Sequence, residues 1–124
     1  MVLSDKLKLE FNEAGCVLMP SLISTDHAAA LRSKVLELAE FEIEIGDPDI
    51  YSFDKSGKTQ RVWNLVNKDQ MFRELFEINI VDEFMNYIFD RRTQHQKYYL
   101  SSFQANIIYP GSDRQKLHID TPFP

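Results

Sequence analysis

The stretch YYLSSFQANIIY, residues 98–109, decides which fold the chain is expected to adopt. It is rich in aromatic, β-branched and small residues, which favour a β-strand. Because side chains alternate between the two faces of a strand, the residues fall into two sets. One face is largely apolar and carries Tyr99, Phe103, Ala105, Ile107 and Tyr109, with Ser101 as the exception. The other face is polar and carries Ser102, Gln104 and Asn106. The stretch therefore predicts one strand of unusual length.

A second strand is predicted shortly after the first. Pro110-Gly111 indicates a turn, and Lys116–Thr121 is expected to be extended. On such a strand His118 and Asp120 point to the same face, whereas Ile119 points away. An imidazole and a carboxylate placed in this way suit one metal ion, and two histidines with one carboxylate are typical of non-haem iron(II). On spacing alone an ordinary surface pair is the better interpretation, and the context of the two strands favours the metal site.

Helices are expected before this sheet. Leu7–Glu13 suggests a short helix or an extended arm, and Gly15–Met19 suggests a short strand that buries Cys16. Ser24 or Thr25 is a suitable N-cap for a long helix. The apolar stripe of that helix consists of Ala28, Leu31, Val35 and Leu38.

The middle of the chain combines a loop, a short strand and two helices. Gly46–Gln60 is rich in Asp, Ser, Gly and Pro and predicts a long loop, whose aspartates lack the spacing of a calcium-binding EF-hand. Arg61–Val66 predicts a short strand, with Trp63 expected in the core. Asn67 and Gln70 have capping-box spacing before the first helix. The second helix carries Ile80, Phe84, Tyr87 and Ile88 on one face. Helices followed by a sheet predict an α+β fold.

The composition limits the function classes. The 124 residues allow one small domain, and a hydrophobic content of 44% suffices for a core. With 14 basic and 19 acidic residues the net charge is -5, and no basic stripe suggests DNA or RNA binding. The chain has a single cysteine, Cys16, which fits a reducing compartment. It has no signal-peptide pattern, and no apolar run approaches the ~20 residues that a membrane span requires. We therefore expect a cytoplasmic protein that binds neither nucleic acid nor membranes.

Several segments resemble the phytanoyl-CoA dioxygenase family, whose members are iron- and 2-oxoglutarate-dependent oxygenases. The residues ANIIYPG at 105–111, followed by HID at 118–120, are similar to the entry to the family's metal site. The residues RVWNL at 61–65 and FNEAGCV at 11–17 are similar to its helical N-terminal part. The resemblance covers nearly the whole chain, and the His-x-Asp pair is its specific element.

The resemblance implies a double-stranded β-helix, or jelly-roll, with helices packed outside it. Residues 1–124 would be the N-terminal portion of a single oxygenase domain, with helices and short strands at 1–97 and the start of the jelly-roll at 98–124. Two metal ligands, His118 and Asp120, would bind Fe(II) together with a distal histidine. Gln104 and Asn106, on the polar face that would line the barrel, either contact the cosubstrate or substrate or are a solvated or structurally bonded pair.

The same resemblance implies the reaction. 2-oxoglutarate would be the cosubstrate, and O2 would be used to hydroxylate an aliphatic C–H bond of a small metabolite or acyl thioester. Relatives that halogenate lack the metal-binding carboxylate, so the presence of Asp120 favours hydroxylation. The enzyme class implied is therefore a 2-oxoglutarate-dependent dioxygenase, an iron-containing oxidoreductase.

One departure from the family pattern concerns the end of the chain. In the family, the distal histidine and the basic residue that holds 2-oxoglutarate follow the His-x-Asp pair, whereas nothing follows Pro124 here. His27 and His95 are expected to be exposed, and their order along the chain is wrong for the distal ligand. We therefore expect a fragment that is inactive alone. The alternative is a non-catalytic remnant or interaction module of the same fold.

Overall fold

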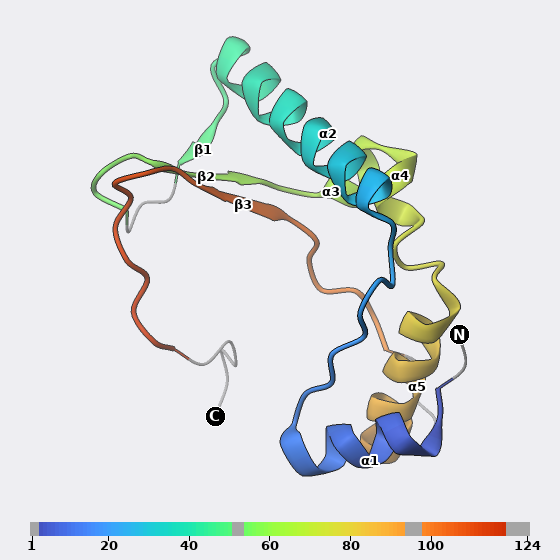
Figure 1. Cartoon of the computed structure of the whole chain (residues 1–124). Coiled ribbons are helices and arrows are strands. Elements are labelled where there is room, and N and C mark those ends of the chain that lie inside the picture. Colours follow the sequence, from blue (N-terminus) through green and yellow to red (C-terminus); the bar gives the residue numbers. More distant parts are fainter. Residues whose placement is uncertain (1–2, 51–53, 94–97, 119–124) are drawn as a thin grey trace. The chain divides into compact units, whose positions relative to one another are not determined.

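The structure is a computed structural model that describes residues 3–50, 54–93 and 98–118, without the side chains of 90–93. This part of the chain has an α+β fold, as expected, with five helices and one three-stranded antiparallel sheet (Figure 1). The elements are α1 (Asp5–Ala14), α2 (Thr25–Glu44), β1 (Asp49–Ile50), β2 (Thr59–Val62), α3 (Leu65–Lys68), α4 (Gln70–Arg73), α5 (Asn79–Thr93) and β3 (Ala105–Ile108).

The chain forms two compact units, which are described separately. The helical unit comprises Met1–Lys34 and Asn64–Phe103, and the sheet unit comprises Val35–Trp63 and Gln104–Pro124. The helical unit contains α1, α3, α4 and α5, the sheet unit contains the three strands, and α2 is divided between them. Each unit combines segments that are distant in sequence, so each depends on long-range contacts.

The helix α1 is capped by Ser4 at its N-terminus and by Gly15 at its C-terminus. The Ser4 hydroxyl accepts a hydrogen bond from the backbone N–H of Leu7, and Gly15 ends the helix in the left-handed conformation with φ 73°. The backbone after Gly15 therefore leaves a helix cap instead of entering a sheet. The prediction of a buried strand at Gly15–Met19 is wrong: Leu18 is 80% exposed, and Cys16 is exposed as well.

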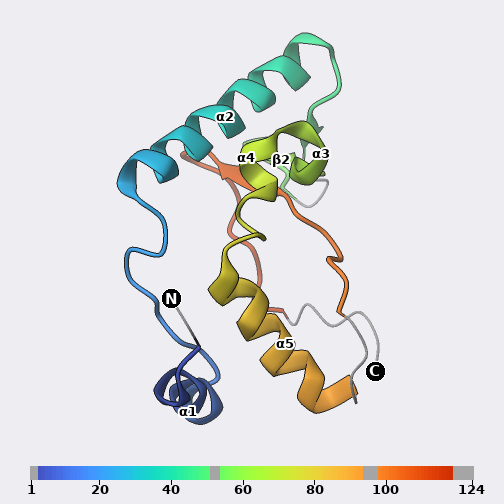
Figure 2. The same ribbon diagram turned by 90° about the vertical axis from the view of Figure 1, so that its right-hand side faces the viewer.

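The core of the helical unit lies where α1 and α5 cross and pack against each other (Figure 1; Figure 2). Leu3, Ile80 and Phe84 are buried there, and Phe11 meets Phe84 edge to face at 5.5 Å between ring centroids. This confirms the apolar face predicted for the second helix. Of the helix predicted before it, after the expected capping box at Asn67 and Gln70, the short helix α4 forms. Its N-cap is Asp69, which accepts from the Met71 N–H at 3.0 Å.

The sheet unit is organised around β2, the central strand. β2 pairs antiparallel with β1 and with β3, where Thr59 lies opposite Ile108 and Val62 lies opposite Ala105. The Gln60 side chain is buried and donates to the Ala39 carbonyl of α2 at 3.1 Å. One face of the sheet therefore packs on α2.

The long loop predicted at Gly46–Gln60 contains β1 and the first two residues of β2. Residues 51–53 of that stretch lie outside the described residues.

The strands are shorter than predicted, and the aromatic packing explains the largest difference. Only Ala105–Ile108 of the expected strand over residues 98–109 pairs with β2. Phe103 belongs to the helical unit instead, where its ring lies 4.7 Å from that of Phe76 and its carbonyl accepts from the Leu65 N–H at 3.0 Å. Asn64, with φ 54°, ends the extended chain after β2, so the predicted strand at Arg61–Val66 is also too long. Residues 116–118 are not in a strand.

We predict that Phe84→Ala lowers the free energy of unfolding by about 3–5 kcal/mol, because it leaves a cavity between α1 and α5. Urea unfolding followed by circular dichroism measures the change. Leu18→Ala is the matched control and should change the free energy by less than about 0.5 kcal/mol, since Leu18 is 80% exposed. Equal effects of the two substitutions would contradict this core assignment.

Candidate metal-binding segment

His118 lies in the irregular segment that follows β3, and its side chain is exposed. Its Nδ1 lies 2.8 Å from the backbone carbonyl of Lys116, and its Nε2 lies 3.2 Å from the side-chain nitrogen of Gln115. Because a carbonyl can only accept, the contact with Lys116 requires a proton on Nδ1. In the neutral tautomer with that proton, Nε2 would accept from the Gln115 amide. Histidines that bind metals through Nε2 usually hold Nδ1–H on a carbonyl in this way.

The second predicted ligand, Asp120, lies outside the described residues, as do Ile119 and His95. The convergence of His118 and Asp120 on one ion therefore stays a prediction. Within residues 3–50, 54–93 and 98–118, no group of three or more His, Cys, Asp or Glu side chains is placed to hold a metal ion.

The two predicted polar contacts, Gln104 and Asn106, have different environments. Asn106 is exposed, and its Oδ1 accepts from Arg61 Nε at 3.2 Å. Gln104 is half-buried, and its Oε1 is buried without a hydrogen-bond partner. A buried acceptor that lacks a donor is costly, so Gln104 is the better candidate for a hydrogen bond to a bound molecule.

A row of polar side chains crosses the face of the sheet that lies away from α2. Asp49, Arg61 and Asn106 occupy neighbouring positions in the register of the three strands. The Arg61 guanidinium stacks on the Trp63 ring at 4.2 Å, and Trp63 Nε1 donates to the Asp49 carboxylate. Burial lowers the pKa of Arg61, and the charge of Asp49 opposes that effect. Trp63 was expected in the core but is 40% exposed, because it supports Arg61 on this face.

Asp54 and Asp113 join two turns of the sheet unit, an arrangement called the aspartate clasp below. The Asp54 carboxylate is 4% exposed, and its Oδ1 accepts from the backbone N–H of Asp113 at 3.3 Å and from both donors of Ser56. The Asp113 carboxylate accepts in return from the Lys55 N–H at 3.0 Å. Sequence reasoning missed this pair, because the partners are 58 and 59 residues apart and neither has a distinctive local pattern.

The hydrogen bonds around Asp54 lower the pKa of its carboxyl group. The hydroxyl of Ser56, then that of Thr59, lower the pKa of Asp54 from its ordinary value of 3.8 to about 2, and they outweigh the opposite effect of burial. Asp54 is therefore ionised at any physiological pH. A permanently charged, nearly buried carboxylate makes a strong acceptor for the two turns that it joins.

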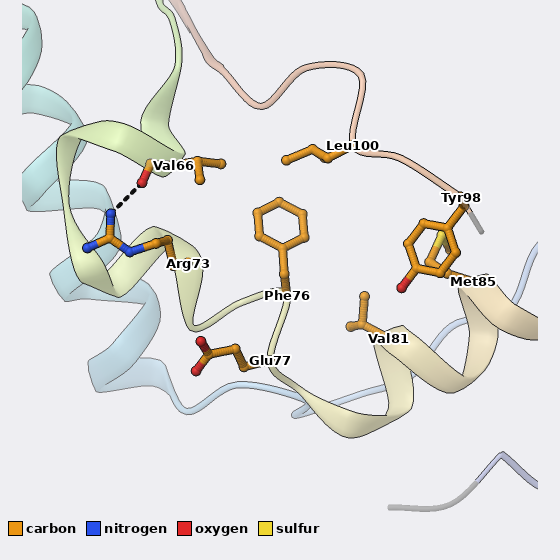
Figure 3. A pocket seen from close by; sticks show the side chains of 8 residues that line it. All are labelled: Val66, Arg73, Phe76, Glu77, Val81, Met85, Tyr98 and Leu100. Atoms are coloured by element: carbon orange, nitrogen blue, oxygen red, sulfur yellow. Dashed lines mark hydrogen bonds between the residues drawn. The ribbon is translucent and has the colours of Figure 1, made fainter.

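A separate pocket of about 350 Å³ lies in the helical unit (Figure 3). Its wall is mainly apolar and is formed by Val66, Arg73, Phe76, Glu77, Val81, Met85, Tyr98 and Leu100. Arg73 Nη1 donates to the Val66 carbonyl at 2.7 Å, and the Tyr98 hydroxyl donates to Asp82 at 2.6 Å, which raises the pKa of Tyr98. Arg73 and Tyr98 thus make local contacts, and none of Gln104, Asn106 and His118 lines this pocket.

Neither a protein-family model, nor a curated protein, nor a solved structure matches the chain. None of the helices in the described part of the chain is long and apolar enough to cross a membrane.

We predict that Asp54→Asn reduces the acid sensitivity of the protein. Because the pKa of Asp54 is lower in the folded chain than its ordinary value, the carboxylate stabilises the fold above pH 3.8, and this contribution is lost as the pH falls from 3.8 through about 2. Urea midpoints measured across that pH window should therefore fall less steeply for Asp54→Asn than for the wild type. Asp47→Asn, at an exposed position of the same connection, should retain the wild-type slope.

Proposed function

We propose that this chain carries part of the active site of an Fe(II)- and 2-oxoglutarate-dependent dioxygenase. The observation that supports the proposal is the environment of His118, whose Nδ1 lies 2.8 Å from the Lys116 carbonyl oxygen while its Nε2 lies 3.2 Å from the Gln115 side-chain nitrogen. That amide can be displaced by a metal ion, because a hydrogen bond of 3.2 Å between exposed neutral groups is weak. The His-x-Asp spacing places a carboxylate two residues further on.

The donor set suits iron. An imidazole nitrogen and a carboxylate oxygen, joined by one further histidine, form the facial triad of non-haem iron(II) enzymes. His118 and Asp120 would hold the ion, and the third ligand would come from outside the described residues. When bound, iron(II) supplies the redox chemistry by which one O2 and one 2-oxoglutarate convert R–H to R–OH, with succinate and carbon dioxide as the other products.

The protein's own residues would orient the reactants. In a jelly-roll whose helices pack outside, α2 covers the outer face of the sheet, and the face that bears Arg61 and Asn106 lines the barrel. Gln104 would contact the substrate or the cosubstrate. Its buried Oε1 would accept from a hydrogen-bond donor of the substrate, because 2-oxoglutarate carries only acceptors at neutral pH. The substrate class remains the one implied by the family resemblance, a small metabolite or an acyl thioester with an aliphatic C–H bond.

The test is iron-dependent succinate formation by the protein expressed from its natural reading frame. We predict that His118→Ala and Asp120→Ala each abolish turnover, because each removes an iron ligand. His27→Ala is the matched control, since His27 lies in the first turn of α2, and it should leave turnover unchanged. Full turnover in either ligand variant would contradict the proposal. Failure of the wild type to bind iron would favour a non-catalytic interaction module instead.

A further inference from the structure

The segment that leads from β3 to His118 is tied to the rest of the sheet unit at two places. The Tyr109 N–H donates to the Lys58 carbonyl at 3.0 Å and extends the contact between β2 and β3 by one step. The aspartate clasp then holds Asp113 through its N–H and its carboxylate. Between these two points the chain turns at Gly111, whose φ of 86° suits glycine, and the Ser112 N–H donates to the Tyr109 carbonyl at 3.1 Å.

The anchor for Asp113 is preformed. Asp54 accepts from the backbone N–H of Ser56 at 2.9 Å and from the Ser56 hydroxyl, so its carboxylate is oriented by its own turn. It is 4% exposed, which excludes most competing water from its Oδ1. The Lys55 N–H of the same turn donates to the Asp113 carboxylate, so two parallel contacts set both the position and the direction of the chain at Asp113.

Positions 114–117, which lie between Asp113 and His118, have no further tie of this kind. Within the described residues, the hydrogen bonds of positions 114–117 stay inside their own segment, and Leu117 is fully exposed. The clasp is thus the last long-range anchor before His118. A metal ligand must be held within about 0.5 Å of its productive position, and on an irregular segment the anchors of that segment contribute to this.

We propose that Asp54 and Asp113 are positioning residues for His118: the clasp sets where the metal-binding segment leaves the sheet. This inference rests on the proposed function, because it assumes that His118 binds a metal. A purely structural role would predict that loss of the clasp lowers stability and leaves the metal affinity of the folded protein unchanged. A positioning role predicts that the affinity falls while the protein remains folded.

Co(II) titration of the full-length protein, followed by its d–d absorption, separates these roles. Asp113→Ala removes an exposed carboxylate and leaves the core intact, and we expect it to weaken Co(II) binding about tenfold and to shift the d–d bands. Asp113→Asn keeps an acceptor for the Lys55 N–H and should restore both. Asp47→Ala, which removes another exposed aspartate of the sheet unit, should bind like the wild type.

Urea midpoints measured on the same samples confirm that each variant is folded at the titration temperature. A folded Asp113→Ala variant with wild-type affinity and wild-type bands would overturn the positioning role while leaving the proposed function intact. A wild type that binds no Co(II), or His118→Ala binding as tightly as the wild type, would instead overturn the proposed function, and the inference would fall with it.

Discussion

The antiparallel pairing of β2 with β3 is the constraint on which the sheet unit depends. It joins parts of the chain that are 45 residues apart, as the hydrogen bond from Arg61 to Asn106 illustrates. The same pairing brings the turn after Asp54 to the turn before Asp113, so the aspartate clasp exists only because the two strands are in register. A shift by one residue would also exchange the two faces of β2, exposing Gln60 and burying Arg61.

Parts of this arrangement could be predicted from sequence because they rest on local physics. The long helix after Ser24, whose hydroxyl accepts from the His27 N–H, and the apolar face of α5 follow from capping and periodicity. The α+β class follows from the order of such patterns. The stretch over residues 98–109 shows the limit, since its composition favours a strand throughout, yet Phe103 packs on Phe76 in the helical unit. Packing partners distant in sequence override local preference there.

The candidate site divides in the same way. The His-x-Asp pair can be recognised in the sequence by its spacing, whereas the contact of His118 with the Lys116 carbonyl cannot be predicted from any spacing. Asp54 and Trp63 show the converse. Asp54 was expected in a loop, and its hydrogen bond with Asp113 places it in the aspartate clasp. Trp63 was expected in the core, and its ring instead stacks with the Arg61 guanidinium.

We propose that His118 binds a metal ion through Nε2. ¹⁵N NMR of the histidine side chains tests it most directly, because the two ring nitrogens of each tautomer have distinct chemical shifts. We predict that His118 carries its proton on Nδ1 in the metal-free protein and that anaerobic Fe(II) broadens its resonances while those of His27 persist. A proton on Nε2 of His118, together with resonances that Fe(II) leaves unchanged, would contradict the account.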